Sequence, residues 1–356
     1  MNGVSARLPL TAREIDQLPN VTSGNILVYT CNSNRALAAS IAKKLGIGLG
    51  KSEVGTFSDG EIYTRIEETI RGADIYIVQS TSPPVNNNLM ELLIMIDAMK
   101  RASAGHINAL IPYFGYARQD RKARARDPIT AKLVANLLTK AGADRVITMD
   151  LHCAQLQGFF DIPVDHLHGQ PILVEYYAEK FKDVMDEVTV VSPDLGSVSR
   201  SRNFAARLNA PLAIVDKRRP KDNETEVLNI IGDIAGKRVI LADDIVDTAG
   251  TLTGAAKALL ARGAKEVYAC ATHAVLSGSA IERLTESPIT ELMVLDTIDL
   301  AQDKRTGKIR VLSAADLFCE AIKRIHGGLS VSELFYAPEL SASGKVREII
   351  LPGAAG

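Results

Sequence analysis

The chain has 356 residues, of which 46% are hydrophobic and 23% are charged, and its formal net charge is −1. This length and composition are typical of a soluble globular protein with about two domains. The near-neutral charge supports neither a nucleic-acid partner nor a membrane partner. The N-terminus has no signal-peptide pattern and no apolar run is long enough to span a membrane, so we expect a cytoplasmic protein.

The cysteines also favour a reducing compartment. No CxxC pair is present, and each cysteine lies in or next to an apolar segment. We therefore expect buried thiols and no disulfide. The residues are Cys31, Cys153, Cys270 and Cys319.

Apolar strands alternate with helices along most of the chain. Residues 1–23 are expected to form a loosely ordered extension. Predicted strands follow at 25–30, 73–79, 107–112, 145–149, 188–191, 212–215, 238–241, 267–271 and 291–295. Predicted helices include 35–45, 86–99, 129–141 and 198–208, and 163–171 is interpreted as the connection between two halves. Continuous apolar strands separated by helices indicate an α/β fold with mostly parallel sheets covered on both faces.

A weak internal repeat supports two related halves. Residues 141–152 resemble residues 262–273, and Gly263 stands 121 positions after Gly142. The same spacing places the acidic stretch 243–250 opposite the basic stretch 122–129. Chance remains an alternative, because Gly-Ala before a strand is common.

The stretch from Val239 to Thr251 is the strongest candidate site. An apolar strand runs into three aspartates, then Thr248, Ala249, Gly250 and Thr251, and a helix follows. A helix N-terminus offers unpaired N–H groups and a favourable dipole to an anion. The carboxylates of Asp243, Asp244 and Asp247 suit sugar hydroxyls or a divalent metal, so a phosphorylated sugar is the expected ligand. The alternative is a surface turn with acidic helix caps.

Three further segments follow predicted strands. The loop at 116–126 carries many cations and fits a polyanion such as a nucleoside triphosphate. His152 and Asp194 each stand at the carboxyl end of a strand, where ligands gather in α/β sheets. Cations at 217–219 suit stabilisation of charge in a transition state. Solvated basic loops, a structural histidine and an Asp helix cap are the respective alternatives.

Together these motifs resemble the ribose-phosphate pyrophosphokinase (phosphoribosyl pyrophosphate synthetase) family, of its phosphate-activated class, from about Asn25 to Phe335. The motifs are Phe57–Glu61, Ala117–Lys122, Asp150–His152, Gln157–Pro163, Ser192–Asp194, Asp216–Arg219, Asp243–Thr251 and Ser330–Phe335. The resemblance implies transfer of the pyrophosphoryl group of ATP to the 1-hydroxyl of ribose 5-phosphate. The products would be AMP and phosphoribosyl pyrophosphate, for nucleotide, histidine and tryptophan biosynthesis.

The resemblance also implies two phosphoribosyltransferase-like domains. We expect the first at 24–168, completed by 328–340, and the second at 169–327, with a frayed tail at 341–356. Neighbouring subunits would share the ATP site, so a homo-oligomer is implied, typically a homohexamer built from dimers.

Residue roles carried over from the family fall into five groups. The catalytic pair would be Lys217 and Arg219. ATP would meet Phe57, Asp59, Glu61, Arg118 and Gln119. Ribose 5-phosphate would meet Asp243, Asp244, Asp247, Thr248, Ala249, Gly250 and Thr251. Mg²⁺ would be held by His152 and Asp194, although nitrogen is an unusual ligand for Mg²⁺. The regulatory site for inorganic phosphate, the expected activator, or ADP would use Arg71, Ser103, Arg126, Ser330 and Ser332.

The sequence departs from the family at Ser197, where a glycine is usual, and the hydroxyl can donate at a helix start. Two alternatives stay open. A phosphoribosyltransferase that uses the activated sugar would share the acidic turn, and a non-catalytic homologue would share the fold.

Overall fold

The computed structural model describes residues 25–218, 227–335, 338–340 and 346–348. The expected extension at 1–23 lies outside the described residues, as does most of the expected tail at 341–356. The chain forms two compact units, one from residues 1–167 with 314–334 and the other from 168–313 with 335–356. The sequence predicts a return to the first domain at residue 328, and residues 314–334 belong to the first unit.

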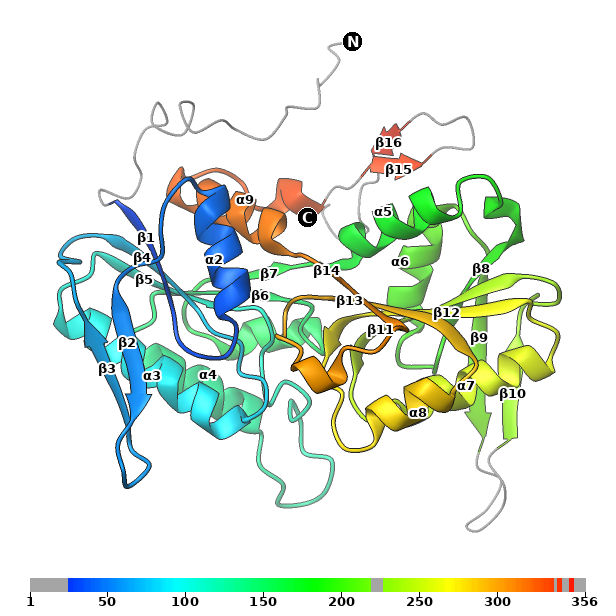
Figure 1. Cartoon of the computed structure of the whole chain (residues 1–356), viewed down its shortest axis with the longest axis horizontal. Helices are drawn as coiled ribbons and strands as arrows, with labels where there is room; N and C mark the ends of the chain where they lie inside the picture. Colours follow the sequence, from blue (N-terminus) through cyan, green and yellow to red (C-terminus); the bar gives the residue numbers. More distant parts are fainter. Residues whose placement is uncertain (1–24, 219–226, 336–337, 341–345, 349–356) are drawn as a thin grey trace. The chain divides into compact units, whose positions relative to one another are not determined.

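The first unit contains a five-stranded parallel sheet of order β1-β4-β5-β6-β7. Its strands are β1 (Ile26–Thr30), β4 (Asp74–Val78), β5 (His106–Ile111), β6 (Arg145–Met149) and β7 (Val164–Leu167). Helices α2 (Arg35–Lys44) and α9 (Ala315–His326) cover one face, and α3 (Val85–Arg101) and α4 (Thr130–Ala141) cover the other (Figure 1). Both faces are therefore apolar, and β4 is buried along its whole length.

Two parts of the first unit differ from the sequence prediction. A separate antiparallel hairpin, β2 (Ser52–Thr56) with β3 (Ile62–Ile66), was not predicted. Residues 163–171 were interpreted as a connection, but they contain β7, the fifth strand of the sheet.

The second unit contains a seven-stranded sheet of order β10-β9-β8-β11-β12-β13-β14, in which only the β9–β10 pair is antiparallel. Its strands are β8 (Val188–Ser192), β9 (Leu212–Arg218), β10 (Val227–Ile231), β11 (Arg238–Val246), β12 (Glu266–Ala274), β13 (Ile289–Leu295) and β14 (Ile309–Leu312). Helices α5 (Gln170–Lys180) and α6 (Val198–Leu208) cover one face, and α7 (Gly250–Ala261) and α8 (Ala280–Glu286) cover the other (Figure 1). The predicted α/β class with mostly parallel sheets is confirmed.

Short elements complete the described chain. They are the 3₁₀ turns η1 (Ala154–Phe159), η2 (Met185–Glu187), η3 (Gln302–Lys304) and η4 (Ser332–Phe335), and the two-stranded ribbon β15 (Pro338–Leu340) with β16 (Val346–Glu348).

The internal repeat has a structural counterpart. In the first unit α4 connects the neighbouring parallel strands β5 and β6, and in the second α7 connects β11 and β12. Strand β6 begins at Arg145 and β12 begins at Glu266, which is the spacing found in the sequence. The turns before α4 and α7 are thus equivalent in topology, and one is basic while the other is acidic.

Candidate active site

The acidic segment lies at the carboxyl end of β11 in the second unit. The strand extends five residues past the predicted end at Leu241, so Asp243 and Asp244 are strand residues and the turn itself begins at Asp247. Neighbouring strands explain the extension, because Asp243 lies opposite Ala271 of β12 in the sheet register. A strand holds the two carboxylates more rigidly than a turn would.

The N-terminus of α7 has properties that suit an anion. The helix begins at Gly250 without any side-chain cap, and its first turn has no acidic residue. Thr248, Gly250 and Thr251 are exposed, while Leu252 and Ala255 anchor the helix in the core. The first N–H groups therefore face solvent and carry the positive end of the helix dipole.

The turn before α7 is held in an unusual conformation. Ala249 has φ 60° and ψ 1°, in the left-handed region that costs a non-glycine residue about 1–2 kcal/mol. Ser277 donates a hydrogen bond to the Asp247 carboxylate, and Arg283 Nη1 donates to the Thr248 carbonyl at 2.9 Å. A Cβ atom at Gly250 would lie 3.6 Å from Arg283 Nη1 and 3.9 Å from the Thr248 hydroxyl, so the space above the turn is open to a ligand.

Residues of α6 contact the acidic pair. The Ser197 hydroxyl donates to Asp243 Oδ1 at 2.9 Å. Arg200 Nη1 lies 3.1 Å from Asp244 Oδ1 and 3.4 Å from Asp243 Oδ1. Burial, and then repulsion from Asp244, raises the pKa of Asp243 to about 7, whereas Arg200 acts in the opposite direction.

Asp194 follows β8 on the same unit. Its Oδ1 accepts the Ser197 backbone N–H at 2.9 Å, and α6 begins one residue later. One carboxylate oxygen of Asp194 therefore acts as a helix cap, and this hydrogen bond also fixes the direction of the side chain. Ser197 connects Asp194 with Asp243 through its N–H and its hydroxyl.

The basic loop of the first unit carries concentrated positive charge. Arg121, Lys122, Arg124 and Arg126 are exposed, and within the described residues none of them forms an ion pair. Arg118 is exposed as well. The four cations without an ion pair in the described part of the chain, Arg121, Lys122, Arg124 and Arg126, follow a parallel strand and favour a polyanionic ligand over the solvated-loop alternative.

Gln119 has a structural contact in this loop. Its carbonyl accepts the Ala131 N–H at 3.2 Å, and its side-chain oxygen accepts the Thr130 hydroxyl. Both contacts lie at the first turn of α4, so Gln119 joins the basic loop to that helix.

His152 lies in the segment that follows β6. Asp150, two residues earlier, has φ 38°. The Leu151 N–H donates to Nε2 of His166 at 2.9 Å, so the β7 histidine fixes the path of residues 150–152. His152 is exposed, and it belongs to a loop whose backbone is thus tied to the sheet.

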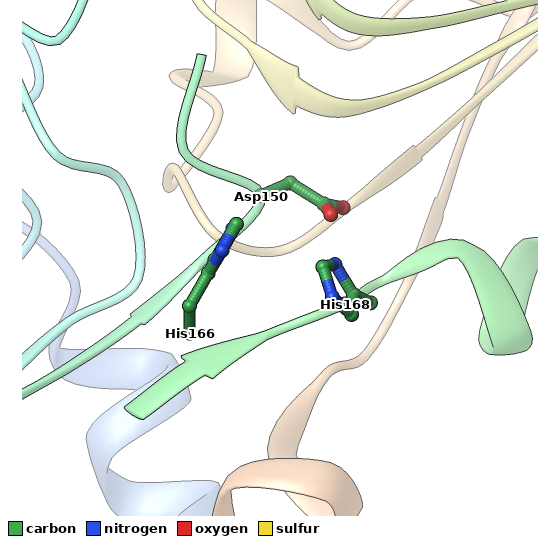
Figure 2. Close-up of side chains that lie close together, drawn as sticks. All are labelled: Asp150, His166 and His168. Atoms are coloured by element: carbon green, nitrogen blue, oxygen red, sulfur yellow. The ribbon is translucent and has the colours of Figure 1, made fainter. Parts of the chain in front are cut away.

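Asp150, His166 and His168 bring their ligand atoms within 4.8 Å of one another (Figure 2). Neither predicted metal residue, His152 nor Asp194, belongs to this group. Nε2 of His166 already accepts a backbone N–H, which sets its tautomer and competes with metal ligation. His166 therefore supports the loop structurally.

The predicted catalytic pair is described only in part. Lys217 lies near the end of β9, opposite Leu228 of β10, so the strand continues past its predicted end at Val215. The side chain of Lys217 and the whole of Arg219 lie outside the described residues.

The predicted adenine contacts occupy the tip of the unpredicted hairpin. Phe57, Asp59 and Glu61 are all exposed in the turn between β2 and β3. The Phe57 N–H donates to the Glu61 carbonyl at 2.7 Å, and the Phe57 ring centroid lies 4.8 Å from that of Tyr63 with the ring planes tilted by 44°. An aromatic ring that is 51% exposed on a hairpin tip is suited to contact another molecule.

The predicted regulatory residues all lie in the first unit. The Ser103 carbonyl accepts the N–H of Gly72, the residue after Arg71, and the hydroxyls of Ser330 and Ser332 lie 2.6 Å apart. Arg126 lies in the basic loop with φ 73°. Arg71 is thus next to a residue that bonds Ser103, and Ser330 contacts Ser332. Within the described residues no hydrogen bond or ion pair joins these residues to Arg126.

All four cysteines are free, as expected, but Cys153 is only half-buried and donates to Asp120. No helix within the described ranges is long and apolar enough to cross a membrane.

The fold defines an α/β protein with an exposed, uncapped helix start in one unit and a basic loop in the other. Comparison with known proteins identifies the family. Residues 26–142 match the N-terminal domain of ribose phosphate pyrophosphokinase, and residues 215–336 match the phosphoribosyl synthetase-associated domain.

Full-length relatives agree. The chain is 65% identical over 313 residues to the ribose-phosphate pyrophosphokinase of Caldanaerobacter subterraneus, covering 88% of this chain and 98% of the relative. It is 59% identical over 313 residues to that of Corynebacterium ammoniagenes, with the same coverage. The crystal structure of phosphoribosylpyrophosphate synthetase from Mycobacterium smegmatis superposes with a TM-score of 0.80 at 42% identity, over 85% of this chain and 98% of that one.

The chain belongs to the ribose-phosphate pyrophosphokinase family. It is an enzyme that transfers a diphosphate group.

Sequence reasoning missed several residues that shape the acidic site. Ser277 and Arg283 come from later segments, and nothing in the sequence places them against Asp247 or Thr248. The sequence does indicate that Arg200 lies on the same helix face as Ser197, because it is about one helical turn later at the start of a predicted helix.

Proposed function

We propose that the chain transfers the β,γ-diphosphoryl group of ATP to the 1-hydroxyl of ribose 5-phosphate and holds that acceptor at the acidic segment. Asp243 and Asp244 accept hydrogen bonds from the ribose 2- and 3-hydroxyls. Residues 247–251 surround the 5-phosphate. The observation that carries this assignment is the uncapped, exposed start of α7 directly beyond the two strand carboxylates.

The donor contacts are assigned to the basic loop and the hairpin. Arg118 and Gln119 contact ATP, supported by the unpaired cations around them. Phe57, Asp59 and Glu61 reach the adenine of ATP bound to a neighbouring subunit. This assignment requires an oligomer, for which we propose a homohexamer.

The reaction needs positioning and charge stabilisation more than covalent chemistry. The 1-hydroxyl oxygen attacks the β-phosphorus, the bond from that phosphorus to the α-phosphate oxygen breaks, and AMP leaves. Lys217 and Arg219 stabilise the charge that develops on the transferred group. The hydroxyl proton passes to solvent or to a phosphate oxygen.

Mg²⁺ accompanies ATP in this proposal. Asp194 supplies an oxygen ligand of the kind Mg²⁺ prefers, and its Ser197 contact aims it. His152 supplies nitrogen, which fits Mg²⁺ less well, and Asp150 offers an oxygen two residues earlier. When bound, the ion would neutralise charge on the phosphate chain.

Regulation is assigned to the first unit. Inorganic phosphate activates, and ADP competes, at Arg71, Ser103, Arg126, Ser330 and Ser332. The four free thiols support a reducing compartment such as the cytoplasm.

The test measures AMP formed from ATP with Mg²⁺ and phosphate present, with and without ribose 5-phosphate. We expect AMP only when the sugar is added, and Lys217→Ala supplies the matched low-rate control. A phosphoribosyltransferase or a non-catalytic homologue would form no AMP, and that result would reject the proposal.

A further inference from the structure

Ser197, directly before α6, and Arg200 and Ser201 in its first turn contact three consecutive residues of β11. The Ser201 hydroxyl donates to the Ala242 carbonyl at 3.2 Å, the Ser197 hydroxyl donates to Asp243 Oδ1, and Arg200 pairs with Asp244 and Asp243. Residues 197, 200 and 201 share one helix face, because they are three and four positions apart. The helix is therefore registered against the strand at the position where the acidic pair begins.

One oxygen of Asp243 is saturated by the protein. Its Oδ1 accepts the Ser197 hydroxyl at 2.9 Å and the Asp244 N–H at 2.9 Å, and it lies 3.4 Å from Arg200 Nη1. These contacts restrict rotation of the carboxylate about its side-chain bonds. A carboxylate with fewer accessible orientations loses less entropy when a ligand hydroxyl is bound.

Arg200 also offsets the negative charge of the Asp243–Asp244 pair. The side chains of Asp243 and Asp244 are 19% and 6% exposed, and both carry like charge on adjacent residues. Arg200 forms ion pairs with both of them and remains 29% exposed itself. Its backbone is held too, since Gln170 Nε2 donates to the Arg200 carbonyl at 3.0 Å.

We propose that Ser197 and Arg200 are positioning residues that hold the Asp243–Asp244 pair in the orientation that receives the ribose hydroxyls. The proposal rests on the proposed function, because the ligand of the pair is taken to be ribose 5-phosphate. It adds a role for Ser197, the residue at which this chain departs from the usual glycine.

The matched variants are Arg200→Met, Arg200→Lys and Ser197→Ala, with Arg202→Met as control. Arg202 is exposed on the same helix and has no ion pair within the described residues. Ser197→Ala keeps the N–H that binds Asp194, and the lost hydroxyl makes no helix-cap bond. It therefore removes only the contact with Asp243.

Calorimetric titration with ribose 5-phosphate and steady-state kinetics in both substrates provide the readouts. Arg200→Met is expected to weaken ribose 5-phosphate binding about tenfold to a hundredfold, as for a lost hydrogen bond to a charged group. The KM for ATP should change about twofold at most, since no ATP contact is removed. Arg200→Lys should recover most of the loss, Ser197→Ala should show a smaller loss, and Arg202→Met should match the wild type.

Three results would overturn the positioning role. They are unchanged or tighter sugar binding in Arg200→Met, equal losses for sugar and ATP, or no recovery in Arg200→Lys. If Arg200→Met does not fold, the other two variants decide. Wild-type sugar affinity in Ser197→Ala would reject the role of Ser197. Equally weakened binding of sugar and ATP in Arg200→Lys would reject the role of Arg200. A wild-type enzyme that forms no AMP would instead reject the proposed function.

Discussion

The pKa of Asp243 leads to a prediction about the pH dependence of sugar binding. An ionised carboxylate accepts a hydrogen bond from a ribose hydroxyl more strongly than a protonated carboxyl group does. Burial raises its pKa from 3.8 to about 7, a shift worth about 4 kcal/mol at 1.36 kcal/mol per unit. Affinity for ribose 5-phosphate should therefore rise about tenfold per pH unit as the pH approaches 7 from below, and level off above it.

The same pKa shift makes the ligand-free protein less stable as the pH rises. A carboxyl group whose folded pKa is raised stabilises the fold below its unfolded pKa near 4, and this contribution is lost as the pH rises through about 7. The free protein should thus lose thermal stability between pH 4 and pH 7, while bound ribose 5-phosphate should offset the loss. Arg200 and Asp244 are the charged groups that contact Asp243.

Titration calorimetry between pH 5.5 and 8.5 tests this reasoning. The sugar phosphate titrates in the same range, so Asp243→Asn serves as the control that keeps the ligand's own titration. The wild type should show the steeper pH dependence, and Asp243→Asn should be the more stable of the two at pH 8 without ligand. Parallel binding curves for the two proteins would refute the assignment of Asp243.

The remaining predictions concern three other positions. Lys217→Ala should lower kcat by orders of magnitude while ribose 5-phosphate still binds, and normal turnover with lost sugar binding would contradict a transition-state role. Arg126→Ala should reduce activation by phosphate more than the basal rate, and an unchanged phosphate titration would remove Arg126 from the regulatory site. Thr251→Asp should leave the melting temperature unchanged or raise it, since an acidic residue suits a helix start, yet it should cost at least about tenfold in sugar affinity through repulsion of the 5-phosphate. Unaltered affinity in that variant would place the phosphate elsewhere.

The buried parallel strands were predictable because their apolar runs are continuous, and α6 has the predicted bounds. Less regular strands were not. β2 and β3 contain half-buried and exposed residues without a fully buried one, and β7 has only four residues, one of which is His166. The low strand propensity of aspartate predicts a turn at Asp243 and Asp244, but pairing with β12 extends β11 through both residues.

The candidate site was predictable wherever one segment contains it. The acidic turn and the start of α7 are contiguous in the chain, so their proximity follows from the sequence alone. Contacts from Ser197, Arg200 and Arg283 depend on how α6 and α8 pack, and no local pattern encodes that packing. The roles of His152 and Asp194 remain predictions, since they lie in different units.

Phosphorus NMR of a reaction containing ATP, Mg²⁺, phosphate and ribose 5-phosphate tests the central claim most directly. The account predicts that AMP appears together with an intact diphosphoryl group attached to carbon 1 of the sugar, in equal amounts. Formation of ADP with a singly phosphorylated 1-position, or no reaction of the sugar, would contradict it.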